Sequence, residues 1–142
     1  TGGALSLLPQ KPTEPLLVLN GDVLTRVDYG RLLRFHDEHQ PAATLCVREH
    51  TTQIPYGVVR MDDLHVLALE EKPVLSHYVN AGMYLLDPVL LDLVPQGCFF
   101  DMPKLLEKAM QHQHRVSAFP IHEYWLDVGH PETLERAHGE WV

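Results

Sequence analysis

Two aspartates in this sequence each follow an apolar run and stand beside glycine. Asp22 ends the stretch LVLNGD, and Asp127 lies within WLDVG. If both carboxylates meet at one rim of a sheet, their oxygens suit Mg²⁺, which takes one or two carboxylates together with phosphate oxygens and water. A structural interpretation, in which each acid only caps its own loop, explains the pattern equally well. Asn-Gly-Asp is also ordinary turn chemistry.

A lysine and an amide are further candidates. Glu71 and Lys72 end a predicted strand just before Pro73, so the Lys72 ammonium can project towards a crevice and hold a phosphate as a point charge. The alternative is a solvated, structural charged pair. Asn80 lies among apolar residues in VNAGMY, so its amide is either a satisfied core group or a ligand contact.

Other catalytic patterns are missing from the sequence. His112 and His114 are two residues apart, a spacing that does not share a helical face, and neither HExxH nor GxSxG occurs. Cys46 and Cys98 form no CxxC motif, so we expect two free thiols and no disulfide.

Size and charge restrict the class of protein. A chain of 142 residues with 45% hydrophobic content predicts one globular domain, and its net charge of −8 argues against nucleic acid as a partner. No apolar run is long enough to span a bilayer, and the first residues lack the features of a signal peptide, so we expect a cytoplasmic protein without membrane contact. The sequence opens on Thr1, Gly2 and Gly3 rather than on Met, which suggests an incomplete domain.

The hydrophobic patterns predict an α/β protein. A strand over 16–19, a helix over 28–39 capped by Asp28 and a strand over 42–49 form a βαβ unit. A hairpin with Asp62 and Asp63 at its turn follows, and it should make the sheet mixed. The later elements are expected as a strand over 77–87, a short helix over 88–94, a helix beginning near Asp101, a strand over 115–121, an extended piece over 123–129 and a terminal helix over 130–141.

Seven segments together carry a family resemblance. They are TGGAL, LVLNGD, YGVV, EEKP, VNAGMYLLDP, FDMPKLLEK and YWLDVGHPETLERA, and they run through the whole chain. In this order they resemble the sugar-1-phosphate nucleotidyltransferases, also called nucleotide-sugar pyrophosphorylases. The nearest likeness is to the bacterial subgroup similar to mannose-1-phosphate guanylyltransferases and glucose-1-phosphate thymidylyltransferases. The resemblance implies a Rossmann-like, glycosyltransferase-A-like mixed sheet flanked by helices.

The resemblance also implies roles for single residues. Asp22 and Asp127 match the family's two Mg²⁺ ligands, and Lys72 matches the lysine that holds the sugar phosphate. The other matches are substrate contacts: Gly57 against the sugar, Glu71 to sugar hydroxyls, Asn80 and Gly82 lining the sugar pocket, and Thr1, Gly2 and Gly3 at the end of the base-contacting loop. Gly2 departs from the alanine that is usual there.

The implied activity is transfer of a nucleotidyl group from a nucleoside triphosphate to a sugar 1-phosphate, with release of pyrophosphate. The family's Gly-rich loop GGxGTRL is absent from this sequence, so we expect residues 1–142 to be the C-terminal part of one catalytic domain. By itself this part should be inactive, and uncovered strand edges should favour a homo-oligomer or a strand-exchanged dimer. The alternative is a non-catalytic module that senses a sugar phosphate or a nucleotide. The sequence leaves the sugar and the base open.

Overall fold

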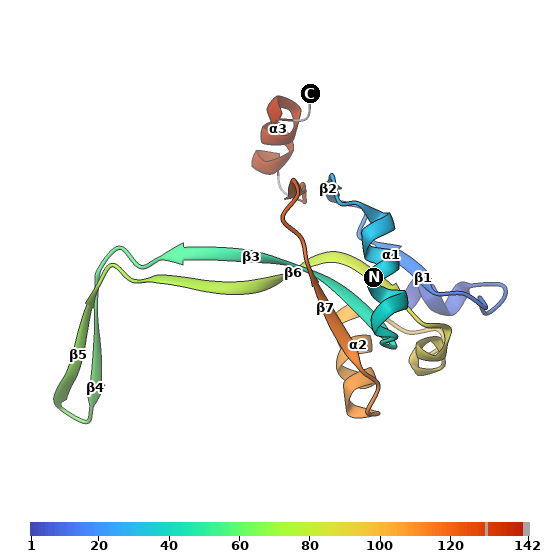
Figure 1. Ribbon diagram of the computed structural model, residues 1–142, viewed down its shortest axis with the longest axis horizontal. Coiled ribbons are helices and arrows are strands. Elements are labelled where there is room, and N and C mark those ends of the chain that lie inside the picture. The colour runs from blue at the N-terminus through green and yellow to red at the C-terminus, as the bar shows by residue number, and fades with distance from the viewer. Residues whose placement is uncertain (130, 141–142) are drawn as a thin grey trace.

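The computed structural model describes residues 1–129 and 131–140 and is built on three sheets. The main sheet has the strand order β1-β6-β3-β7, and two further sheets pair β2 with β8 and β4 with β5 (Figure 1). In chain order the elements are η1 (Gly2–Leu7), β1 (Leu16–Leu19), β2 (Val23–Thr25), α1 (Tyr29–His39), β3 (Ala43–Gln53), β4 (Gly57–Asp62), β5 (His65–Glu71), β6 (Val74–Leu86), η2 (Pro88–Leu93), α2 (Met102–Gln111), β7 (Val116–Pro120), β8 (Trp125–Asp127) and α3 (Pro131–Glu140).

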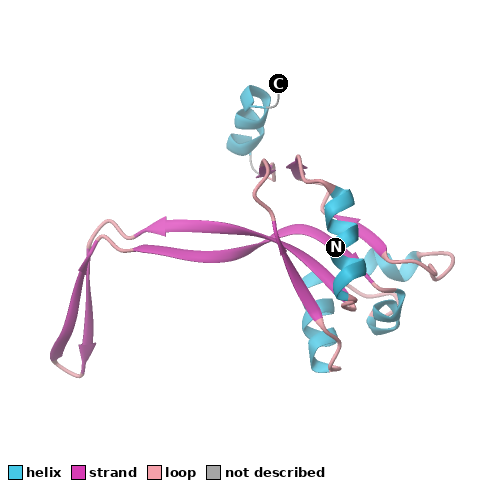
Figure 2. Ribbon diagram, in the orientation of Figure 1, coloured by secondary structure: helices cyan, strands magenta, loops and turns pink. Residues whose placement is uncertain are grey.

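Helices cover both faces of the main sheet (Figure 2). Alternate residues of β6 point to opposite sides, as in any strand. Tyr84 and Leu86 join a buried cluster with α2 and η2, whereas Met83 and Leu85 join a second cluster with Leu32 of α1. This three-layer arrangement confirms the predicted mixed sheet flanked by helices.

The strand connections differ from the predicted pattern in two respects. β1 and β3 both run antiparallel to β6, so they are parallel to each other with β6 between them rather than adjacent. The hairpin over 57–71 does form, with its turn one residue later than expected, but it is a separate sheet. The main sheet is therefore mixed because of β6, and the prediction that the hairpin mixes it was wrong.

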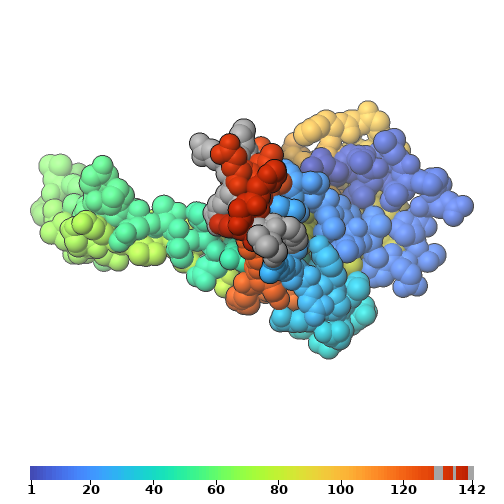
Figure 3. Space-filling view, turned by 90° about the horizontal axis from the view of Figure 1, so that it is seen from above, coloured from blue at the N-terminus to red at the C-terminus, as the bar shows by residue number. Residues whose placement is uncertain are grey.

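The hairpin is separate because β3 and β6 run on beyond the body of the molecule. They remain paired as far as Gln53 and Val74 and form a two-stranded ribbon that carries β4 and β5 at its far end (Figure 1). The space-filling view shows this ribbon and hairpin as an arm that projects from the body (Figure 3).

The helix boundaries agree closely with the sequence-based expectations. Asp28 caps α1 by accepting a hydrogen bond from the Arg31 backbone amide, and Asp101 caps α2 in the same way through Lys104. The short helix after Asp87 is present as the 3-10 helix η2. The terminal helix is present as α3, although the expected end residues 130 and 141 lie outside the described residues. Both cysteines are free, as expected.

The described helices include none that is long and apolar enough to cross a membrane.

A buried histidine predicts that acid will destabilise the fold. His36 on α1 is 4% exposed and shares a 2.8 Å hydrogen bond with the Thr44 hydroxyl on β3. Burial lowers the pKa of His36, against the opposing negative charges of Asp37 and Asp87. The unfolded chain therefore binds a proton at the ordinary pKa of 6.5, whereas the native chain binds it only at a lower pH, so the stabilisation is complete above pH 6.5 and declines as the pH falls below it.

This expectation can be checked by urea unfolding across pH. The stability advantage of the native chain over a His36→Gln variant should shrink as the pH is lowered through 6.5. The exposed His112 provides the control, because His112→Gln should follow the native chain at every pH. A constant difference between the native chain and His36→Gln would show that His36 does not titrate differently on folding.

Candidate active site

The two aspartates predicted to bind metal come together at one end of the β2–β8 sheet. Val23 pairs with Asp127, and the Val128 amide donates a 2.8 Å hydrogen bond to the carbonyl oxygen of Asp22. A Cβ added to Gly129 would lie 3.0 Å from Asp127 Oδ1 and 3.3 Å from Asp22 Oδ2. Both carboxylates therefore border the same small space, which a larger residue at position 129 would fill.

This donor set fits a hard divalent cation that keeps most of its other ligands. Two carboxylates with open surroundings suit Mg²⁺, which retains water and takes phosphate oxygens from a substrate. Among the residues the structure describes, no three His, Cys, Asp or Glu side chains gather closely enough to form an all-protein metal cage. The Asp127 carboxylate is oriented by the Gly129 amide, which donates to Oδ1 at 2.8 Å.

A cavity of about 200 Å³ is lined by Asp127, though not by Asp22, and collects residues from distant segments. Four of the residues predicted from the sequence line it: Thr1, Asn80, Gly82 and Asp127. The remaining lining residues are Asn20, Val23, Ala81, Tyr84, Pro103 and Trp125. The cavity thus joins the start of the chain, the β1–β2 turn, the middle of β6, the start of α2 and β8.

An irregularity in β6 shapes the floor of this cavity. The register of the β3–β6 ladder shifts between Leu45 and Val47, and Gly82 opposite this shift has a φ of +71°. The Gly82 amide donates to Asn80 Oδ1 at 2.8 Å, and Asn80 Nδ2 donates to the Tyr84 hydroxyl at 2.9 Å. Bulges commonly re-aim side chains next to functional sites, and here the bulge brings the Asn80 amide and the Tyr84 hydroxyl together on the cavity wall.

Hydrogen bonds to backbone carbonyl oxygens fix the other walls of the cavity. The Asn20 backbone amide donates to the Gly82 carbonyl oxygen, and Trp125 Nε1 donates to the Ala81 carbonyl oxygen, both at 2.8 Å.

Burial raises the pKa of Tyr84, and the nearby Asp101 charge adds to this effect, while the hydrogen bond from Asn80 opposes it. The Tyr84 hydroxyl is therefore neutral near pH 7 and stays available as a hydrogen-bond donor.

The glycines at the start of the chain support the cavity rather than line it. Gly2 is buried, and a Cβ there would lie 3.0 Å from the Asp101 carbonyl carbon. Gly3 donates its amide to the Phe100 carbonyl oxygen at 2.8 Å, and the Thr1 hydroxyl accepts from the Met102 amide at 3.3 Å. These contacts hold Thr1 beside the start of α2, where Pro103 also borders the cavity.

The remaining predicted residues form a second group on the arm. Gly57 pairs with Glu71, whose Oε2 would lie 3.1 Å from a Cβ at position 57. Lys72 follows directly with a φ of +48°, and its amide donates to the Tyr56 carbonyl oxygen. The structure brings these three residues together but leaves them at the far end of the β3–β6 ribbon, away from the β2–β8 sheet (Figure 1).

Tyr84 and Trp125 were missed from the sequence, although the sequence held a signal for each. Trp125 precedes Asp127 by two residues, a spacing that puts both side chains on one face of a strand. Tyr84 follows Asn80 by four residues on β6, which has the same consequence in a strand. A search for aromatic residues in phase with the candidate polar groups would have found both.

Comparison with known proteins gives a consistent result. The family model described as nucleotidyl transferase matches residues 3–141. The chain is 27% identical to the mannose-1-phosphate guanylyltransferase catalytic subunit beta of Xenopus tropicalis, over the whole chain and 44% of that protein. It is 32% identical to the probable mannose-1-phosphate guanylyltransferase 2 of Oryza sativa subsp. japonica, over 92% of the chain and 38% of that protein. The chain thus spans less than half the length of these curated relatives.

Solved structures show the same fold. HddC from Yersinia pseudotuberculosis superimposes with a TM-score of 0.68 at 23% identity, over the whole chain and 62% of that structure. A putative glucose-1-phosphate thymidylyltransferase from Bacillus anthracis, solved in complex with a sucrose, gives a TM-score of 0.70 at 18% identity, over 98% of the chain and 59% of that structure. The likenesses confirm the predicted Rossmann-like architecture.

Proposed function

Because this chain belongs to the nucleotidyl transferase family, we propose that it forms the C-terminal part of a catalytic domain that makes nucleotide-sugars. The reaction joins a nucleoside triphosphate to a sugar 1-phosphate and releases pyrophosphate. One observation carries the proposal: four residues predicted from three separate motifs line one cavity, and the Asp22 carboxylate faces that of Asp127 across Gly129. A domain in which those acids only cap their loops would not require this convergence.

The reaction requires the protein mainly to position two anions. An oxygen of the sugar 1-phosphate attacks the α-phosphorus of the triphosphate in line with the departing pyrophosphate, and positioning with charge neutralisation dominates such transfers. Asp22 and Asp127 would hold Mg²⁺, which when bound supplies positive charge to the phosphate oxygens. Asn80 and Tyr84 offer hydrogen bonds to a bound sugar, and the Gly82 turn lets the substrate approach the backbone closely.

The group of residues on the arm binds the sugar phosphate in this proposal. It consists of Gly57, Glu71 and Lys72. The net charge of −8 of residues 1–142 opposes the binding of a second anion, and the Lys72 ammonium offers a cation to offset it. To supply this cation, the arm must bring Lys72 over the cavity when the substrate binds or in the whole protein. In that position the ammonium would pair with the phosphate of the sugar.

Replacing this lysine tests that role. Lys72→Gln in the whole protein should raise the KM for the sugar 1-phosphate by roughly ten- to a hundredfold, because a hydrogen bond to a charged group contributes about 1.5–3 kcal/mol. The KM for the triphosphate should change little. Arg60→Gln, which removes a charge of the same sign from the same hairpin, serves as the control and should leave both constants unchanged. Equal effects of the two substitutions on the KM would contradict the proposed role of Lys72 in binding the sugar phosphate.

The proposed reaction is tested by pyrophosphate release from the whole protein with Mg²⁺, across a matrix of nucleoside triphosphates and hexose 1-phosphates. A signal for one pair would establish the activity and identify the base and the sugar. Silence across the matrix, from folded protein that binds a sugar phosphate tightly, would instead support the sensing module.

The location, partners and self-association of the protein are further parts of this proposal. We propose a cytoplasmic location because the sequence has no membrane-length apolar run and its first residues lack signal-peptide features, and no nucleic-acid partner because the net charge is −8. The curated relatives named above come from a frog and from rice and the solved structures from bacteria, so a bacterial origin stays a prediction. Self-association also stays a prediction, favoured by the partly exposed Leu17 and Leu19 on the edge strand β1.

A further inference from the structure

The sheet that brings Asp22 and Asp127 together is very short. β2 and β8 share three residue pairs, from Val23 with Asp127 to Thr25 with Trp125. Two-stranded sheets of this size are marginal in water, and a slip of one residue turns every side chain to the opposite face. Contacts beyond the three pairs must therefore hold the register that places both carboxylates beside Gly129.

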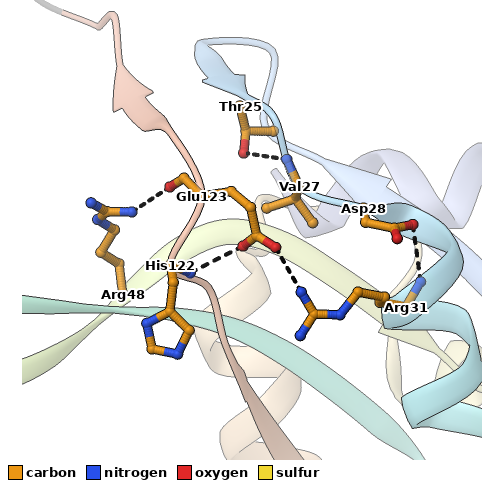
Figure 4. Close-up of polar contacts among 7 residues, drawn as sticks. All are labelled: Thr25, Val27, Asp28, Arg31, Arg48, His122 and Glu123. Atoms are coloured by element: carbon orange, nitrogen blue, oxygen red, sulfur yellow. Dashed lines mark hydrogen bonds and ion pairs between the residues drawn. The ribbon is translucent and has the colours of Figure 1, made fainter.

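Such contacts gather at the opposite end of the same sheet. The Thr25 hydroxyl and the Arg26 amide each donate a 3.0 Å hydrogen bond to the Tyr124 carbonyl oxygen. Next to them, Arg31 Nη1 donates to Glu123 Oε1 at 3.0 Å (Figure 4). The ion pair thus lies beyond Thr25 and Trp125, whereas the two aspartates lie at the other end.

Glu123 is held from two further directions. Arg48 of β3 donates through its guanidinium to the Glu123 carbonyl oxygen, and the His122 amide donates to Glu123 Oε2 at 3.0 Å (Figure 4). Backbone hydrogen bonds at Glu123 and His122, together with the charge of Arg31, lower the pKa of the Glu123 carboxyl against the opposing effect of partial burial. The segment that leads into β8 is therefore fixed to the main sheet by its backbone and to α1 by its side chain.

Hydrogen bonds also order the segment between β2 and Arg31. The Arg31 backbone amide donates to the Asp28 carboxylate at the start of α1, and the Val27 amide donates to the Thr25 hydroxyl at 3.2 Å. Two local hydrogen bonds thus order residues 25–31, the segment that leads from β2 to Arg31. Arg31 lies in the helix that follows β2, and Glu123 lies just before β8. Their ion pair therefore joins the segments that flank the two strands.

We propose that Arg31 and Glu123 are positioning residues that set the register of β2 against β8 and thereby the spacing of the Asp22 and Asp127 carboxylates. The metal-binding part of this inference rests on the proposed function, whereas the register does not. The side chains of Arg31 and Glu123 are 57% and 27% exposed, and partly exposed ion pairs add little to global stability. The ion pair therefore acts on the geometry of the β2–β8 sheet and not on the stability of the whole fold.

The test uses the whole protein with Arg31→Gln, Glu123→Gln and the double substitution. Mn²⁺ affinity, measured by paramagnetic resonance of the free ion, should fall by roughly tenfold in each single variant, as is typical when a group that orients metal ligands is removed. The double variant should lose no more than either single one, because the two residues act as one unit. Lys11→Gln removes another ion pair, with Asp92, whose side chains are 46% and 67% exposed, and it should change nothing.

Hydrogen exchange supplies a readout that needs no metal. The Val128 amide, which donates to Asp22, should exchange faster in both single variants, while the amides of β3 and β6 keep their protection and the urea midpoint is unchanged. If the native protein binds no Mn²⁺ but Val128 exchange still responds, the register role stands and the metal site fails. Val128 exchange and Mn²⁺ affinity equal to those of Lys11→Gln would overturn the inference, and so would effects that add in the double variant.

Discussion

Asp127→Asn should almost abolish turnover in the whole protein while leaving its fold intact. Asparagine keeps the shape of the side chain and the oxygen that accepts the 2.8 Å hydrogen bond from the Gly129 amide, but it removes the negative charge that faces Asp22 across Gly129. Loss of one preorganised electrostatic group at a phosphoryl-transfer site costs roughly 10²–10³-fold in rate. Pyrophosphate release at saturating substrates, with the Mg²⁺ concentration that just saturates the native protein, measures the loss.

Asp92→Asn is the matched control for this prediction. Asp92 is also an exposed carboxylate, paired with Lys11 and absent from the cavity lining, so its loss should leave turnover near normal. Added Mg²⁺ should recover part of the Asp127→Asn activity if the variant only weakens metal binding. Near-native turnover of Asp127→Asn at ordinary Mg²⁺ would disprove the metal-ligand assignment.

Gly82→Ala should be the most destabilising small substitution in the cavity wall. Gly82 has a φ of +71°, where an L side chain costs about 1–2 kcal/mol. A Cβ there would also approach Asn20 Nδ2 to 2.8 Å and Val23 Cγ2 to 3.1 Å. Because overpacking adds about 1–3 kcal/mol, the free energy of unfolding should fall by roughly 2–5 kcal/mol, as measured by urea unfolding.

Gly97→Ala separates the effect of backbone strain from the effect of overpacking. Gly97 has a φ of +66°, close to that of Gly82, but a Cβ added there meets nothing within 4 Å. This variant should therefore show the backbone strain alone and lose only about 1–2 kcal/mol. Equal losses in the two variants would mean that Asn20 and Val23 move aside at no cost and do not enclose the cavity tightly.

Sequence reasoning was most successful where the determining interactions are local. The caps at Asp28 and Asp101 and the hairpin turn near Asp63 depend on residues within a few positions of one another. Asp22 and Asp127 were recognised because each stands at the end of an apolar run. The sequence did not show whether the two carboxylates meet, because the pairing of β2 with β8 joins segments about a hundred residues apart.

Non-local contacts account for what was missed. β2 has only three residues and no distinct hydrophobic pattern, so no periodicity marks it. Arg31, Arg48 and Glu123 look like ordinary surface charges until the fold brings them together. The place of Lys72 at the tip of a long ribbon was equally inaccessible, because strand propensity does not say where paired strands leave the body of the sheet.

The central claim is that Asp22 and Asp127 form one divalent-cation site, and paramagnetic broadening by Mn²⁺ in the isotope-labelled protein tests it most directly. At low Mn²⁺ the amide signals of Asp22, Val128 and Gly129 should broaden first, Mg²⁺ should reverse the effect, and Asp127→Asn should prevent it. Broadening confined to other acidic surface positions, with Val128 and Gly129 unaffected, would contradict the claim.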